Sequence, residues 1–230
     1  MAGSLFPKLE GIQAIVFDAY GTLFNVNGPV EKLSGTIGPR SAEFASDWRR
    51  KQLDYSWLRS LMGVHADFWE VIREALDHTM DAFEISEAGL ADELMTCYLK
   101  LDAYDDVAAT LGALRAKNKR LAILSNGSPS MLDSILRHAG LEKNFEAVLS
   151  VEEVGIYKPS RRAYRLVLQR LHIADATSVC FVSANGWDAH AAALFGFQAV
   201  RVARQPVIAE RLPGKPAITI ESLNALPDLV

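Results

Sequence analysis

The sequence predicts the α/β fold class: a parallel sheet with helices on both faces, interrupted by an inserted helical cap domain. Short apolar runs alternate with helix-like segments through residues 102–230, and this alternation is typical of parallel sheets. Residues 26–101 differ, because they carry helical patterns with almost no strand signal. Ligands of parallel sheets collect beyond the carboxyl ends of the strands, so we expect the functional site there.

Short apolar runs are the expected strands. Residues 14–17 form the first, which stops at Asp18 and is followed by Gly21, the pattern of a buried strand that enters a loop. The others cover residues 121–124, 148–151, 179–182 and 199–202. Polar segments follow three of these runs: Ser125-Asn126-Gly127, Tyr157-Lys158-Pro159 and the segment that opens at Ser183. These segments are therefore candidates for the site.

The clearest helix of the sheet region covers residues 128–139. Ser128 is its candidate N-cap, Pro129 stands at the first helical position, and Gly140 follows the last turn. Two further helices are expected over residues 161–171 and 187–195. Each of these helices joins two expected strands, as a parallel sheet requires.

The insert contains helical patterns over residues 41–62, 66–83 and 87–101. We therefore expect two domains, a Rossmann-like core of residues 1–25 and 102–230 and a helical cap of residues 26–101. Because the insert starts just after the first strand, the cap hangs over the end of that strand. In this position it can close on a substrate.

Composition and charge indicate a soluble globular protein. Half of the 230 residues are apolar, 23% are charged, and the formal net charge is −4. The basic cluster Arg49-Arg50-Lys51 is too short for a nucleic-acid footprint, so we expect no nucleic-acid partner. No run approaches the roughly 20 apolar residues of a membrane span, and the amino terminus lacks a signal-peptide pattern. We expect a cytoplasmic protein that binds no membrane.

Cysteines and histidines give no sign of a metal site. Cys97 and Cys180 each lie in an apolar stretch, which favours core thiols over a disulfide. The histidines form neither an HxH nor an HExxH pair, and this disfavours zinc. The sequence predicts no metal ligand and no cofactor.

Asp18 ends an otherwise apolar run. Taken alone, such an Asp more often starts a loop by hydrogen bonding to nearby backbone amides than acts in catalysis. Its wider setting favours catalysis, because four segments occur in order: Phe17-Asp18-Ala19-Tyr20-Gly21-Thr22-Leu23, Ser125-Asn126-Gly127, Lys158-Pro159 and Ser183-Ala184-Asn185-Gly186-Trp187-Asp188. They resemble the motifs of the haloacid dehalogenase superfamily. The resemblance implies that Asp18 is a nucleophile.

Two positions depart from the phosphatases that dominate this superfamily. Tyr20 stands where they carry a general acid, and Ser183 stands where the last motif normally has its first carboxylate, which leaves Asp188 alone. Magnesium favours carboxylate oxygens, so this is a poor magnesium site. At these two positions the sequence resembles the L-2-haloacid dehalogenases. That resemblance implies hydrolysis without a metal.

The resemblance extends over nearly the whole chain and includes residues 47–62 of the cap. This segment looks like the stretch of the family that carries a halide-binding arginine, which implies that role for Arg49. A leaving halide gains charge in the transition state, and a fixed cation in a dry pocket stabilises that charge. Without the motif, an arginine on a cap helix is more often solvated. Arg50 departs from the Gln common in the family, which leaves the local pocket polarity open.

The resemblance also implies roles for other residues. Lys158 contacts the nucleophile or the substrate, and Asp188 helps to hold it. The implied catalytic residues are Asp18, Thr22, Arg49, Lys158, Tyr164, Ser183, Asn185 and Asp188. For each polar member the ordinary alternative is a helix cap, a turn, a buried tyrosine or a surface lysine.

A second set is implied to bind the substrate. It comprises Ala19, Tyr20, Arg49, Leu53, Phe68, Ser125, Asn126, Lys158, Asn185 and Trp187. Ser125 is placed near the substrate carboxylate, whereas Leu53, Phe68 and Trp187 resemble the apolar wall of the pocket. Apolar residues of this kind are more often part of a core than ligand contacts.

The implied reaction is the hydrolysis of a short L-2-haloalkanoic acid to a D-2-hydroxy acid. Asp18 displaces the halide from the α-carbon, and water then cleaves the resulting ester. A phosphatase or phosphonatase of the same superfamily is one alternative, and a noncatalytic binding protein is another, because fold does not imply function. The halogen, the chain length, the use of fluoroacetate and the base for water stay open, with Asp188 the nearest candidate base. The resemblance favours a homodimer.

Overall fold

A computed structural model describes residues 8–204 and 208–230. Its core is one parallel sheet of six strands in the order β3-β2-β1-β4-β5-β6. The strands are β1 (Ala14–Phe17), β2 (Arg120–Ser125), β3 (Ala147–Ser150), β4 (Val179–Ser183), β5 (Gln198–Val202) and β6 (Ile218–Ile220). The predicted α/β class is confirmed, and β1 lies at the centre of the sheet between β2 and β4.

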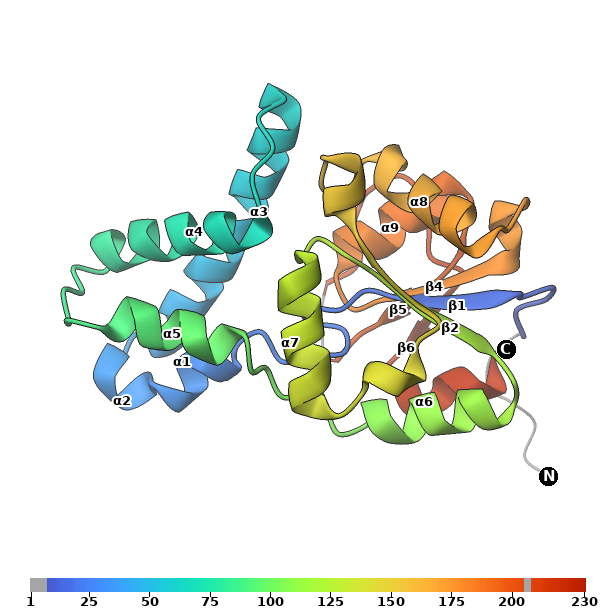
Figure 1. Ribbon diagram of the computed structural model, residues 1–230, viewed down its shortest axis with the longest axis horizontal. Helices are drawn as coiled ribbons and strands as arrows, with labels where there is room; N and C mark the ends of the chain where they lie inside the picture. The colour runs from blue at the N-terminus through green and yellow to red at the C-terminus, as the bar shows by residue number, and fades with distance from the viewer. Residues whose placement is uncertain (1–7, 205–207) are drawn as a thin grey trace.

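Helices cover both faces of the sheet. They are α6 (Val107–Ala116), α7 (Pro129–Ala139), α8 (Arg161–Leu171) and α9 (Gly186–Phe195), with the short 3-10 helices η1 (Glu142–Asn144), η2 (Val151–Val154), η3 (Ala176–Ser178) and η4 (Leu223–Asp228). Figure 1 shows α8 and α9 on one face and α6 on the other. Ser128 is the N-cap residue of α7, and Gly140 ends that helix with a φ of 66° in the left-handed region. Both were predicted.

Several features of the core differ from the sequence prediction, beyond shifts of one residue at the ends of β2, β4, β5 and α9. The run predicted over residues 148–151 is displaced by one residue, because Val151 already opens η2. Helix α6 was not predicted as a separate element. Strand β6 was also missed, because it has only three residues and its apolar signal is correspondingly short.

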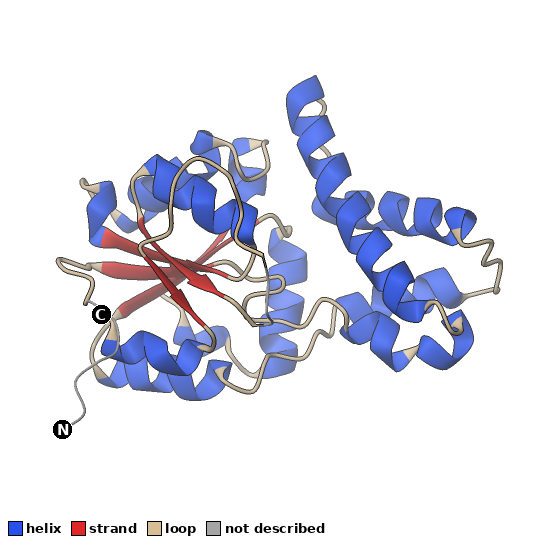
Figure 2. Ribbon diagram, turned by 180° about the vertical axis from the view of Figure 1, so that it is seen from behind, coloured by secondary structure: helices blue, strands red, loops and turns tan. Residues whose placement is uncertain are grey.

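The inserted region is entirely helical. It consists of α1 (Gly28–Lys32), α2 (Ser34–Ile37), α3 (Ser41–Met62), α4 (Phe68–Ala82) and α5 (Leu90–Tyr98). Figure 2 shows these helices grouped to one side of the sheet. The bounds predicted for α3 are confirmed, whereas α4 and α5 are shorter than predicted and the short helices α1 and α2 were missed.

Two antiparallel linkers join the insert to the sheet. Asn25 donates its backbone N–H to the carbonyl of Asp102 at 2.9 Å, and Tyr104 donates to the carbonyl of Leu23 at 3.0 Å. Entry and exit of the insert are therefore hydrogen-bonded to each other close to the end of β1. This geometry places the insert next to the edge of the sheet where the polar segments lie.

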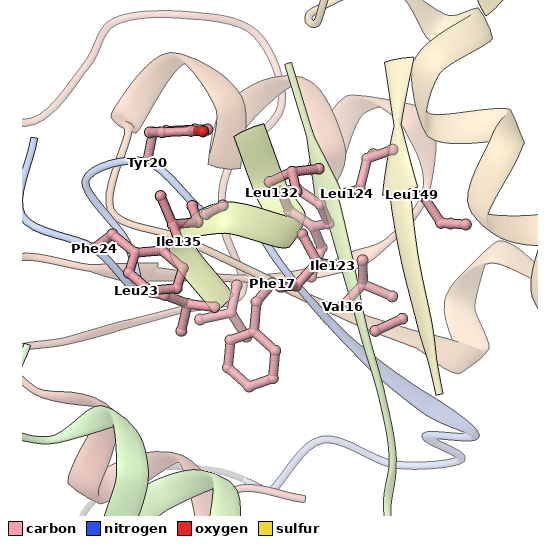
Figure 3. Packing of buried hydrophobic residues seen from close by; sticks show 14 of the residues in the cluster. Val16, Phe17, Tyr20, Leu23, Phe24, Ile123, Leu124, Leu132, Ile135 and Leu149 are labelled. Atoms are coloured by element: carbon pink, nitrogen blue, oxygen red, sulfur yellow. The ribbon is translucent and has the colours of Figure 1, made fainter. Parts of the chain in front are cut away.

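The buried centre of the protein is apolar. Figure 3 shows Phe17, Ile123 and Leu124, from neighbouring strands, beside Leu132 and Ile135 of α7. All five side chains belong to one cluster of buried residues. Such packing fixes the strands, and with them the residues at the strand ends.

Two other observations concern the described residues. None of their helices has the length and apolar character needed to cross a membrane. Both cysteines are free thiols in the described structure, but only Cys180 is buried, whereas Cys97 is partly exposed. The prediction of two core thiols is therefore correct for Cys180 and wrong for Cys97, which lies near the end of a short helix with one face towards solvent.

Candidate active site

The polar segments meet because their strands are neighbours that run in the same direction. Phe17 at the end of β1 pairs with Ile123 of β2 and Val182 of β4. The residues after these positions consequently lie at one edge of the sheet. Asp18 extends β1 by one further hydrogen bond, because its backbone N–H donates to the Val182 carbonyl at 2.9 Å. The backbone of Asp18 is thus anchored between two fully buried strands.

Four side chains surround the Asp18 carboxylate, which is 5% exposed. Thr22 Oγ1 and Asn185 Nδ2 each donate a hydrogen bond to Oδ2 at 2.7 Å, and Ser183 Oγ lies 3.4 Å from the same oxygen. Lys158 Nζ donates to the other oxygen, Oδ1, at 2.8 Å. Oδ2 is therefore held on several sides, whereas Oδ1 has one partner among the described residues. The predicted grouping of these residues around Asp18 is present.

Lys158 is a buried cation between two carboxylates. Its Nζ lies 2.8 Å from Asp18 Oδ1 and 2.8 Å from Asp188 Oδ2, and the side chain is 1% exposed. Burial lowers the pKa of Lys158, but the negative charges of Asp18 and Asp188 outweigh it, so the net shift is upward. The backbone N–H of Lys158 also donates to Asn126 Oδ1 at 2.9 Å. The lysine is thus a charged and fixed part of the site.

Asp188 and Tyr164 lie behind this lysine. Tyr164 donates its hydroxyl to Asp188 Oδ1 at 2.7 Å, while Lys158 occupies Oδ2. Burial, the largest influence, raises the pKa of Asp188, although the Lys158 ammonium opposes the shift. Burial also raises the pKa of Tyr164. Tyr164 is therefore part of the charged network, but its hydroxyl reaches Asp18 only through Asp188 and Lys158.

The loop after Asp18 is held both by the last motif and by a residue outside the motifs. Thr22 Oγ1 accepts a hydrogen bond from the Ala184 backbone N–H at 2.8 Å, and the Thr22 carbonyl accepts one from Arg204 Nη2 at 2.6 Å. Arg204 also forms a salt bridge with Asp106 at 3.0 Å. Sequence reasoning missed Arg204 and Asp106, because nothing in their local sequence ties them to a segment so far away along the chain.

A cavity of about 260 Å³ opens beside the Asp18 carboxylate. It is lined by Asp18, Tyr20, Arg49, Leu53, Phe68, Ser125, Asn126, Lys158, Asn185 and Trp187. Apart from Asp18 itself, every lining residue belongs to the set predicted to bind substrate. Ala19 is the predicted residue that does not line it, because its side chain is fully buried in the core.

A second cavity, of about 1120 Å³, adjoins the first and shares Arg49 and Asn185 with it. Its remaining lining residues come from the start of the insert, between Val26 and Ser46. It contains neither Asp18 nor Lys158 among its lining residues. The smaller cavity is therefore the one in which the Asp18 carboxylate can meet a ligand.

Arg49 enters the small cavity from α3. Its Nη1 donates to Gln52 Oε1 at 3.1 Å, and the Tyr98 hydroxyl donates to the same oxygen at 3.1 Å. Burial raises the pKa of Tyr98, while the positive charge of Arg49 opposes the shift. Gln52 and Tyr98 were not predicted. Gln52 could have been found, because residues three apart on one helix are neighbours and Gln52 follows Arg49 by three. The sequence offered no such signal for Tyr98.

The small cavity is rich in hydrogen-bond donors. The Tyr20 hydroxyl and the Trp187 indole nitrogen are both buried and have no hydrogen-bond partner in the described structure. They line the cavity together with the cations of Arg49 and Lys158. Buried donors are ordinarily satisfied, so unpartnered donors beside two cations suit an anionic ligand. Ser125 adds a hydroxyl, whose oxygen accepts the Gly127 backbone N–H at 3.0 Å.

The residues do not fit a magnesium ion. Lys158 Nζ bridges Asp18 and Asp188, so a protein cation already lies between the two carboxylates. Tyr20 and Ser183 supply no further negative charge. Within residues 8–204 and 208–230, no group of three or more His, Cys, Asp or Glu side chains is placed to hold a metal ion.

Comparison with known proteins identifies relatives over nearly the whole chain. A family model of haloacid dehalogenase-like hydrolases matches residues 12–196. The chain is 43% identical over 223 residues to (S)-2-haloacid dehalogenase 1 of Pseudomonas sp. (strain CBS-3), covering 96% of this chain and 98% of that protein. These matches span both the sheet and the insert.

Solved structures give the same result. The crystal structure of a dehalogenase, 38% identical, superposes with a TM-score of 0.93 over 96% of this chain and 98% of that one. The structure of the L-2-haloacid dehalogenase from Xanthobacter autotrophicus with chloropropionic acid covalently bound superposes with a TM-score of 0.88. It is 37% identical, over 95% of this chain and 98% of that one. On its sequence, its fold and the geometry of its site, the chain belongs to the family of haloacid dehalogenase-like hydrolases.

Proposed function

We propose that this protein is an (S)-2-haloacid dehalogenase, which hydrolyses short L-2-haloalkanoic acids to D-2-hydroxy acids through an ester on Asp18. The observation that carries the proposal is a buried carboxylate, fixed by Lys158 and Asn185, that faces a small cavity also lined by Arg49. The covalently bound chloropropionic acid in a relative of the same fold supports the ester.

In the first step, Oδ1 of Asp18 attacks the α-carbon from the side opposite the halogen. A carbon–oxygen bond forms, the carbon–halogen bond breaks, and the halide leaves with the bonding electrons, so the configuration inverts. Arg49 receives the halide, because a cation fixed in a cavity stabilises charge as it develops. Thr22 and Asn185 hold the other oxygen and so orient the attack.

In the second step, water attacks the carboxyl carbon of Asp18, and the bond between that carbon and the ester oxygen breaks. The hydroxy acid leaves with an oxygen that belonged to Asp18, and the carboxylate regains one from water. Lys158 remains close to the oxygens on which negative charge develops. Asp188, which is joined to Asp18 through Lys158, is the candidate base for this water, and the proton that the water loses ends on the alcohol oxygen of the product.

The cavity suits a short substrate. Its empty space of about 260 Å³ is less than a quarter of that in the neighbouring cavity. Ser125 and the neighbouring donors bind the substrate carboxylate. Leu53, Phe68 and Trp187 contact the alkyl group and exclude water.

We expect halide release from L-2-chloropropionate, with little from the D enantiomer, and we expect the rate to persist in excess chelator. The physical reason is that Lys158 supplies the positive charge between Asp18 and Asp188. Halide can be measured with an ion-selective electrode. A rate that disappears in chelator and returns with magnesium would instead favour a phosphatase-like member of the family.

The inserted helices have two proposed roles. Residues 26–101 act as a cap domain that closes over the core of residues 1–25 and 102–230, of which residues 1–7 and 205–207 lie outside the described structure. The far end of α3 and the residues that follow it present exposed apolar side chains to solvent, at Leu58, Leu61, Met62 and Val64. Clustered apolar surface of this kind marks an association site, and we assign it to a homodimer.

Replacing Leu61 with Glu should convert this dimer to a monomer, because Leu61 is 84% exposed and a charge buried at an apolar interface is costly. Analytical ultracentrifugation at micromolar concentration measures the change. Leu194→Glu, at another apolar residue that is 56% exposed, is the matched control and should leave the dimer intact. A wild-type monomer would contradict the assignment.

A further inference from the structure

The positive charge of Arg49 is available to bind an anion. Among the described residues, no carboxylate lies within salt-bridge distance of its guanidinium, whereas the four other arginines of the cap all form ion pairs. Its hydrogen bond in the described structure goes to Gln52 Oε1, a neutral acceptor, at 3.1 Å. An unpaired guanidinium on a long side chain samples many rotamers, whereas transition-state stabilisation requires one fixed position. Some other group must therefore restrict Arg49.

Gln52 has the properties needed for this task. It is 1% exposed and lies almost one helical turn after Arg49 on α3. Its Oε1 accepts from Arg49 and from Tyr98, both at 3.1 Å, and an amide oxygen has two lone pairs for two donors. Because the amide is neutral, it can orient the guanidinium without neutralising it. A carboxylate at the same place would pair with Arg49 and compete with the halide.

Tyr98 fixes Gln52 in turn. Its side chain is fully buried, and its ring stacks on Tyr20 with centroids 5.7 Å apart and an interplanar angle of 20°. Tyr98 also contacts Trp48, with ring centroids 5.5 Å apart. Tyr20 follows Asp18 by two residues in the loop after β1. The stack thus connects the core loop that carries the nucleophile to the cap helices that carry Arg49 and Gln52.

We propose that Gln52 and Tyr98 are positioning residues that hold the Arg49 guanidinium where the halide leaves during attack by Asp18. Because Gln52 is neutral, the positive charge of Arg49 remains available to the halide. Neither residue contacts the reacting atoms in this role, since both act through Arg49. The inference rests on the proposed function, because it concerns the first of the two chemical steps.

The test separates the two steps in single-turnover experiments with enzyme in excess over L-2-chloropropionate or L-2-bromopropionate. Halide release reports ester formation, and hydroxy acid release reports ester hydrolysis. We expect Tyr98→Phe to slow halide release by about 10-fold, the scale of one lost hydrogen bond. Gln52→Glu should slow it by about 100-fold, the scale of a lost transition-state donor. Both effects should be larger for chloride, the poorer leaving group, and hydrolysis of the ester should keep its rate.

Two further variants make the result unambiguous. Gln52→Met keeps the side-chain length without an acceptor or a charge, and should fall between wild type and Gln52→Glu. Thr79→Val changes another fully buried polar residue of the cap, whose hydroxyl donates to the Ala75 carbonyl, and should leave both steps unchanged. Folding of each variant is checked by circular dichroism.

The inference is overturned if Tyr98→Phe and Gln52→Met slow both steps equally, slow only ester hydrolysis, or keep the wild-type ratio of chloride to bromide rates. It is also overturned if Gln52→Glu releases chloride as fast as wild type. In all these cases the wild-type enzyme still releases halide, so the proposed function stands. A wild-type enzyme that releases no halide from either substrate contradicts the proposed function itself.

Discussion

Replacing Asp18 with Asn is expected to abolish dehalogenation and leave the fold intact. The amide has nearly the volume of the carboxylate and can keep hydrogen bonds to its neighbours, but it is a very poor nucleophile. The loss should be about 10⁴-fold or more, on the scale measured for removal of a catalytic nucleophile. Halide release and thermal unfolding, measured on the same preparation, test both parts of this expectation.

Two controls sharpen the result. Asp105→Asn makes the same chemical change at an exposed residue, and should keep full activity. Intact-protein mass must show that the introduced amide has not been hydrolysed back to a carboxylate, because a small converted fraction would mimic residual activity. If verified Asp18→Asn protein retains even a tenth of the wild-type rate, Asp18 is not the nucleophile.

Replacing Lys158 with Met should reduce both activity and stability. Without the ammonium, the buried carboxylates of Asp18 and Asp188 lose the cation that lies 2.8 Å from each of them. Breaking a buried ion pair by removing one partner costs about 3 kcal/mol or more of unfolding free energy. Turnover should fall by about 100- to 1000-fold, because the negative charge that develops at Asp18 during ester hydrolysis loses the cation beside it. Urea unfolding and halide release measure the two effects.

The matched control for this variant is Lys143→Met, which removes an exposed ammonium. It should change unfolding free energy and turnover very little, since exposed charges contribute about 1 kcal/mol at most. A Lys158→Met enzyme as stable as wild type would mean that the two carboxylates do not both carry charge in the folded protein. Normal turnover would remove Lys158 from the mechanism.

The sequence was most informative where the chain is locally regular. The run Ala14–Phe17, the helix Ser41–Met62 and the helix Arg161–Leu171 have the predicted bounds, because apolar periodicity and flanking polar residues agree there. Strand β6 and the short helices α1 and α2 were missed, since three to five residues carry too little pattern to be recognised. Their positions depend on packing against the rest of the fold.

Some residues of the candidate site could be predicted from the sequence and others could not. Asp18, Lys158 and Asp188 stand at ends of predicted strands or in motifs with a recognisable order, so their meeting could be predicted. Gln52 and Tyr98 could not be found by that route, because their role depends on contacts between α3 and α5. Single-sequence patterns describe neighbours along the chain, and such contacts join residues 46 positions apart.

The most direct test of the proposed mechanism follows oxygen-18 from solvent. With enzyme in excess over L-2-chloropropionate in oxygen-18 water, the ester route releases a hydroxy acid that carries an oxygen from Asp18. The heavy oxygen should then appear in the peptide that contains Asp18, as measured by mass spectrometry, while the product of the first turnover stays unlabelled. If the first product carries the label and the Asp18 peptide stays light, water attacks the substrate directly and the covalent mechanism is wrong.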